Sequence, residues 1–228
     1  MAVELTGTHW TGGSSAGSTA SVTVPADCTY AVFFAGWWIT GLGDGTSLWT
    51  SPSTTGPTLG GNAFSNILLK LDDENEGVEV WVIKNPPTGS QTLSFTWNRT
   101  ASDGAPLSLI FLKGVDISGT AIQAVRSTAR AGNGATATLS GLTVGDYCLA
   151  GACGYGGDIA ISSEFLDVPD YNGDSMSIGG VAAAGTSQAF TQSGSSYNNI
   201  GAIALKPAAA GGASIVPLLM HQYRARRQ

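Results

Sequence analysis

The fold class of this chain is decided by one stretch of sequence, VEVWVIKNPPTGSQTLSFTWN at residues 78–98. Val78–Lys84 has the β-branched and aromatic composition of a strand, and the proline-rich segment at 86–89 ends it with a Thr-Gly turn. Gln91–Asn98 then alternates apolar and polar residues, so that every second side chain lies on one face. The stretch therefore predicts two antiparallel strands joined by a short turn.

The same period-two pattern continues through the rest of the chain, and no segment shows the period of a long helix. Further strands are expected at Ala20–Val24, Cys28–Ile39, Asn66–Leu71, Leu107–Val115, Ala135–Leu139, Asp146–Tyr155, Ser175–Ala183, Gln188–Gln192 and Asn199–Lys206. We predict an all-β fold, a jelly-roll-like antiparallel β sandwich of roughly eight to twelve strands with a short C-terminal extension. No repeat with a period of 20–50 residues is apparent.

The composition favours a folded domain with an uncharged surface. Hydrophobic residues make up 43% of the chain, whereas charged residues make up only 11%, well below the roughly 25% of an average globular domain. Residues 1–206 carry seven Lys and Arg against sixteen Asp and Glu, a net charge of −9, while residues 207–228 carry three arginines and no acid. An acidic body argues against nucleic acid as the main partner.

The character of the sequence changes near the C-terminus, and this change predicts three segments. Residues 1–206 form the β-sandwich domain, residues 207–213 a Gly/Ala linker, and residues 214–228 a basic amphipathic anchoring tail. The residues predicted to bind a partner are the apolar and basic ones of this tail. They are Ile215, Val216, Leu218, Leu219, Met220, Tyr223, Arg224, Arg226 and Arg227.

No catalytic, cofactor or metal site is predicted. The two histidines, His9 and His221, lie outside the strand pattern, so neither is a good candidate for the base of a Ser-His-Asp triad. The three cysteines are interpreted as small buried hydrophobes. Cys148 and Cys153 lie five residues apart in one predicted strand, so their side chains are expected on opposite faces.

Two clusters of acidic residues lie in predicted turns, at 72–76 (DDENE) and 170–174 (DYNGD). Solvated turns are the favoured interpretation, and a bound Ca²⁺ ion is the alternative for both. The second cluster starts like an EF-hand loop but lacks the glycine and the glutamate that such a loop requires. Glu79 beside Trp81 is interpreted as a surface pair on one strand face. The sequence singles out no carboxylate pair for glycoside hydrolysis, but the spacing that matters there is spatial, so a glycan hydrolase remains a third hypothesis.

The predicted strand Cys28–Ile39 (CTYAVFFAGWWI) is apolar on both faces. Tyr30, Val32 and Phe34 share one face, and Phe33 lies on the other. Two interpretations remain open. Either a loop covers the second face of a central strand, or that face is buried against a second copy of the chain.

Several motifs resemble a known group of proteins. The runs VEVWVIKNPP at 78–87, QTLSFTW at 91–97, KGVD at 113–116 and IGAIALKPA at 200–208 are similar to those of β-sandwich virion structural proteins encoded by tailed phages and prophages. The resemblance covers roughly residues 15–208. It implies a non-enzymatic capsid decoration or head-fibre protein, anchored to the major capsid protein or another virion protein by its C-terminal tail.

The resemblance also implies a virion protein that is made in the host cytoplasm. Consistent with this, the sequence shows no signal peptide and no apolar run long enough to span a bilayer, so no membrane partner is expected. A homo-oligomer is expected, with a trimer favoured. The alternative function is a carbohydrate-binding adhesin module of a phage tail or a cell surface, which leaves a glycan ligand open.

Overall fold

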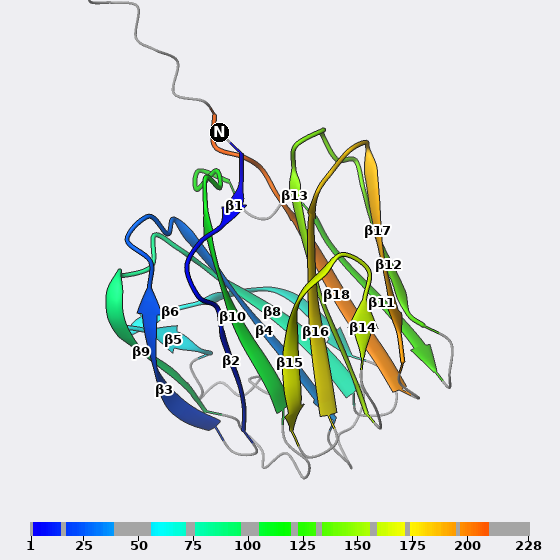
Figure 1. Ribbon diagram of the computed structural model, residues 1–228, viewed down its shortest axis with the longest axis horizontal. Coiled ribbons are helices and arrows are strands. Elements are labelled where there is room, and N and C mark those ends of the chain that lie inside the picture. Colours follow the sequence, from blue (N-terminus) through cyan, green and yellow to red (C-terminus); the bar gives the residue numbers. More distant parts are fainter. Residues whose placement is uncertain are drawn as a thin grey trace, which may run out of the picture.

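The computed structural model describes residues 2–14, 17–38, 56–71, 76–96, 105–119, 123–130, 134–155, 159–171, 174–194 and 197–209. Within these residues the regular secondary structure consists of eighteen strands and no helix (Figure 1). The strands form four antiparallel sheets that pack as sandwich-like layers, which confirms the all-β fold class. The number of strands is higher than the sequence pattern predicted.

The N-terminal half of the chain forms an inner sheet and an outer sheet. The inner sheet has the order β1-β10-β4-β8-β7, with β2 also paired to β10. Its strands are β1 (Glu4–Leu5), β2 (Trp10–Ser14), β4 (Tyr30–Trp38), β7 (Ser65–Leu71), β8 (Glu76–Lys84) and β10 (Ala105–Lys113). The outer sheet has the order β3-β9-β5-β6. Its strands are β3 (Gly17–Val24), β5 (Thr58–Leu59), β6 (Asn62–Ala63) and β9 (Gly89–Thr96).

The C-terminal half repeats this arrangement. Its inner sheet has the order β11-β18-β13-β16-β15, and its outer sheet the order β12-β17-β14. The inner strands are β11 (Gln123–Arg130), β13 (Tyr147–Tyr155), β15 (Glu164–Tyr171), β16 (Asp174–Ala182) and β18 (Tyr197–Leu205). The outer strands are β12 (Thr136–Ser140), β14 (Ala160–Ile161) and β17 (Ser187–Ser193).

The two halves are structural repeats of each other. Eight strands of the N-terminal half match the eight strands β11 to β18 in order along the chain; they are β2, β3, β4, β5, β7, β8, β9 and β10. With this matching the two inner sheets have the same strand order, and so do the two outer sheets apart from the additional β6. Short sequence matches accompany this equivalence: Ser90-Gln91 begins the same strand as Ser187-Gln188, and Leu112-Lys113 corresponds to Leu205-Lys206. The repeat is longer than the 20–50 residues over which the sequence showed no self-similarity.

Three apolar cores separate the four layers. The first lies between the outer and inner sheets of the N-terminal half and contains Phe33, Leu93, Phe95 and Phe111. The third lies between the corresponding sheets of the C-terminal half and is built around Phe190. The second core lies between the two inner sheets, and it joins the halves into a continuous stack.

Strand β4 shows why its sequence is apolar on both faces. Phe33 faces the first core, whereas Tyr30, Val32 and Phe34 face the second core, as the alternation predicted. The second face is covered by the inner sheet of the other half of the same chain, mainly by β13. Neither of the two interpretations from the sequence is correct, since this face is covered by the second repeat of the same chain and not by a loop or a second copy. Cys148 and Cys153 lie in different cores, which confirms that they face opposite ways.

Strands β11 and β15 were missed at the sequence level, and both are edge strands of the C-terminal inner sheet. β11 carries Arg126 and Arg130, and β15 contains Pro169. Edge strands tolerate charge and proline because one side of the strand does not join the hydrogen-bond ladder. The sequence cluster at 170–174 falls where β15 turns into β16, with Tyr171 paired to Asp174.

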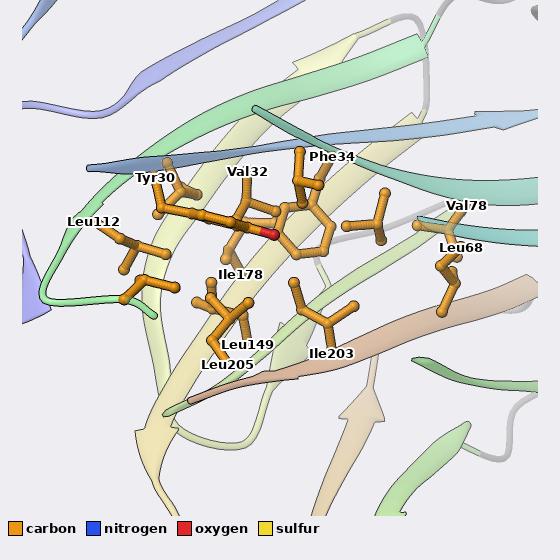
Figure 2. Close-up of a cluster of buried hydrophobic side chains, with 14 of the residues drawn as sticks. Tyr30, Val32, Phe34, Leu68, Val78, Leu112, Leu149, Ile178, Ile203 and Leu205 are labelled. Atoms are coloured by element: carbon orange, nitrogen blue, oxygen red, sulfur yellow. The ribbon is translucent and has the colours of Figure 1, made fainter. Parts of the chain in front are cut away.

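One polar group is out of place in the second core. The side chain of Tyr30 is 1% exposed, and its hydroxyl has no hydrogen-bond partner. Figure 2 shows that this hydroxyl oxygen points in among carbon side chains. Burial raises the pKa of Tyr30 to about 12, so the hydroxyl stays protonated over the ordinary pH range. Tyr147, which begins the equivalent strand β13, is only half-buried.

We predict that Tyr30→Phe stabilises the protein. A buried hydroxyl without a partner costs about 1–3 kcal/mol, and the phenyl ring retains the apolar packing. The matched control is Tyr147→Phe, which is expected to have little effect because Tyr147 is only half-buried and its hydroxyl is not among the buried groups that lack a partner. Urea unfolding of the two variants and the unmodified protein measures the difference. A lower free energy of unfolding for Tyr30→Phe would contradict the prediction.

Candidate functional site

The predicted anchoring tail, residues 214–228, and most of the predicted linker lie outside the described residues. All nine predicted partner-binding residues fall there, from Ile215 to Arg227. The structure does describe the point from which this part of the chain departs. Pro207 pairs with Val115 in a β-bridge, and the Ala208 amide donates to the Gly114 carbonyl oxygen at 2.7 Å. The last described residues are thus held against the segment that follows β10.

The N-terminal strand lies at the same place, and we call this end of the molecule the terminal pole (Figure 1). It consists of residues 2–5, 113–118 and 206–209, together with Asp27, which pairs with Lys113. Strand β1 pairs with the end of β10, where Glu4 lies opposite Lys113. The main chain of Ala2 lies so close to Gly114 that a side chain at Gly114 would collide with it. Both ends of the described chain therefore leave the sandwich side by side.

Charged side chains gather at the terminal pole. The Lys113 ammonium lies 3.3 Å from Asp27 and 3.4 Å from Glu4, and these hydrogen bonds, Asp27 first, raise its pKa. The pKa of Asp27 is lowered, mainly by the Thr6 hydroxyl, which donates to it at 2.6 Å. Both ion pairs are solvent-exposed, so they define the local geometry and contribute little stability.

The outer faces of the molecule have a different chemistry. No Asp, Glu, Lys or Arg occurs in β3, β9, β12 or β17. Exposed hydroxyls face one another across the strands, as Ser21 does with Thr92 and Thr136 with Thr191. The two hydroxyl oxygens of the second pair lie 3.3 Å apart. Each half thus presents an uncharged ladder of Ser and Thr, and charge is concentrated elsewhere.

Glu79 corrects a sequence interpretation, because it is fully buried and is not part of a surface pair. Its Oε2 accepts hydrogen bonds from the Trp81 indole at 2.7 Å and from the Asn66 amide at 3.4 Å. At the equivalent place in the other half, the hydroxyl of buried Ser177 donates to Oε2 of Glu164 at 2.5 Å. Each repeat has one carboxylate in this strand pair. It lies on β8 in the N-terminal half, and in the C-terminal half it lies on β15, the equivalent of β7. For buried Glu79 the two donors supply partners that burial would otherwise deny to its carboxylate, whereas Glu164 is exposed to solvent.

His9 lies between the two halves. Its Nδ1 accepts a hydrogen bond from the Phe111 amide at 3.3 Å, and its ring meets Phe165 of the other half edge-on, with centroids 5.8 Å apart. Burial lowers the pKa of His9. The ring therefore acts as a neutral acceptor, and this was not foreseen from the sequence. His221 lies outside the described residues.

Among the described residues no group of three or more His, Cys, Asp and Glu side chains is arranged to hold a metal ion. Of the acidic cluster at 72–76, only Glu76 is described, at the start of β8. The described part of the chain contains no helix long and apolar enough to span a membrane. Comparison with protein-family models, curated proteins and solved structures finds no match to this chain.

We predict that the His9 contact makes stability depend on pH. Because the pKa of folded His9 is below that of the unfolded chain, the contribution of this site is complete above about pH 6.5. It is lost as the pH falls from there through the lowered folded pKa. Protonation removes the acceptor at Nδ1 and places a charge beside Phe111 and Phe165.

His9→Asn provides the comparison, since its amide oxygen replaces Nδ1 as acceptor and does not titrate in this range. Urea unfolding at pH 7.5 and pH 5.5 should show a smaller loss of stability for His9→Asn than for the unmodified protein. Other groups that titrate contribute equally to both proteins. Equal losses would show that His9 is not the titrating group.

Proposed function

We propose that this protein is a non-enzymatic structural protein of a tailed-phage virion, a capsid decoration or head-fibre protein attached through its C-terminal tail. The observation that carries the proposal is the terminal pole. Residues 206–209 are fixed beside the N-terminal strand, so residues 210–228 continue from one defined end of the stack. Attachment at this end leaves the two outer hydroxyl faces free.

We also infer that each half is a jelly roll. The eight strand positions of a jelly roll can be assigned along the N-terminal half. Positions 1 to 4 are β2, β3, β4 and β5, position 5 is shared by β6 and β7, and positions 6 to 8 are β8, β9 and β10. The inner sheet then has the order 1-8-3-6-5 and the outer sheet the order 2-7-4-5. These orders support a double Greek-key arrangement, which is a common architecture of viral capsid proteins.

The charge distribution supports attachment by the tail. The acidic body and the arginines of residues 224–227 differ in sign, so the tail is suited to an acidic site on a capsid protein. A lone amphipathic segment of this length gains little net free energy on docking, because ordering it costs about as much as burying its apolar side chains returns. We therefore propose a homo-oligomer, a trimer by preference, in which several tails act together.

We predict that deleting residues 210–228 abolishes attachment and leaves the fold intact, because the last hydrogen bond that holds this segment to the sandwich is that of the Ala208 amide. Full-length protein and the truncated form are mixed with bare capsids of the encoding phage, and bound copies are counted. A variant with Arg224, Arg226 and Arg227 changed to Glu should bind weakly, whereas the matched change to Lys should bind nearly as well. Equal binding of the truncated form would place the attachment site in the sandwich.

A carbohydrate-binding adhesin module is the second proposed function, and one hollow favours it. A depression of about 420 Å³ on the N-terminal half is lined by Thr8, His9, Trp10, Ser21 and Thr23, among others. A hollow that combines an aromatic ring with several hydroxyls is a suitable surface for a neutral sugar. Binding to a glycan array that is lost in Trp10→Ala would support this function, and the absence of any glycan signal would remove it.

A further inference from the structure

The two inner sheets pack as if an internal two-fold axis related them. Strand β4 lies on its own equivalent β13, while β2 lies on β15 and β7 lies on β11. Because β2 corresponds to β11 and β7 to β15, the last two contacts are the same contact with the halves exchanged. This reciprocity is the defining property of an isologous dimer interface. The chain therefore contains, in covalently joined form, an interface of the kind that two separate subunits make.

The crossing of β4 and β13 lies at the centre of this interface. Both strands begin with a tyrosine, and we align them from that residue. Phe34 is then equivalent to Gly151 at the fifth position, and Gly36 is equivalent to Cys153 at the seventh. In the structure Phe34 packs on Gly151, and Gly36 packs on Cys153. Each residue thus meets its own equivalent, as expected for residues next to a two-fold axis.

The residues at the axis have diverged into complementary sizes. A Cβ atom added to Gly151 would lie 2.5 Å from Cδ1 of Phe34, and one added to Gly36 would lie 2.7 Å from Sγ of Cys153. Two copies of the N-terminal half would place two Phe34 rings in one space. Two copies of the C-terminal half would leave that space unfilled between two glycines. Both overpacking and cavities are unfavourable in a close-packed core.

We propose that the inner face of each half is a recognition surface specific for the complementary half, whether that half belongs to the same chain or to a second copy. The face is apolar: β4 and β8 contribute Val32, Phe34, Val78 and Val80 to it, and no charged residue belongs to the core that it forms. Only the segment from Gly114 to residue 122 joins the halves covalently. Two copies can therefore associate by exchanging halves.

The first experiment uses the complete chain with a protease recognition sequence inserted after Ser118. This site is suitable because Ile117 is exposed and a Cβ atom added to Gly119 would have no neighbour within 4 Å. After cleavage of the folded protein, native mass spectrometry should show the two fragments bound one to one. Separation of the fragments with the secondary structure of each retained would overturn the proposal.

The second experiment tests exchange between copies. Cleaved protein with an N-terminal affinity tag is mixed with cleaved untagged protein, and the mixture is unfolded and refolded. The tagged N-terminal fragment should capture C-terminal fragments from both sources in proportion to their amounts, and should not capture the untagged N-terminal fragment. Capture of that N-terminal fragment would show that the face does not discriminate and would overturn the proposal.

The third experiment exchanges the large and small residues. In the cleaved protein, Gly151→Phe and Phe34→Gly should each weaken fragment association about a hundredfold or more, whereas the double variant should recover most of the loss. Phe33→Ala is the control, because Phe33 faces the first core and should leave association largely unchanged. A smaller pair, Gly151→Ala with Phe34→Leu, serves if the larger variants do not fold. A double variant no better than the sum of the single ones would contradict the proposal.

Discussion

The close crossing of β4 and β13 is the packing constraint on which the rest of the structure depends. Phe34 lies over Gly151 at this crossing, and the apolar side chains around it join the two inner sheets. Without this contact each inner sheet would expose its whole apolar face to water. Each outer sheet covers the remaining face of an inner sheet with its own apolar side, so its solvent-facing side can be polar.

This layered arrangement accounts for the low content of charged residues. Four layers need three cores, so a large share of the residues must be apolar, and the outer strands and the terminal pole differ in their surface chemistry. The outer strands carry Ser and Thr ladders, while Glu4, Asp27 and Lys113 gather at the terminal pole. A surface of this kind permits close approach of neighbouring molecules on the outer faces without charge repulsion. The pole is one place where charge can orient a partner.

Divergence between the repeats affects the buried polar groups as well as the interface. Glu79 has its equivalent in Ser177, and Asn66 corresponds in position to Glu164, so each half retains one carboxylate and one neutral donor while exchanging their places. At the axis a large and a small residue likewise form a pair, because the Phe34 ring occupies the space beside Gly151. Glu79 is the buried carboxylate of the two, and leaving it without a donor would be costly, as would an unfilled space at the axis.

The sequence by itself determined the all-β class, the strands with clear alternation such as β8 and β9, and the opposite orientation of Cys148 and Cys153, because these follow from the two-residue period of a strand. It missed the edge strands β11 and β15, where charge and proline are tolerated and the pattern is weak. Only the tertiary structure decided what covers β4, the burial of Glu79 and the contact of His9 with Phe165. Each depends on residues far apart in the chain, and the repeats share too little sequence for periodicity alone to bring them together.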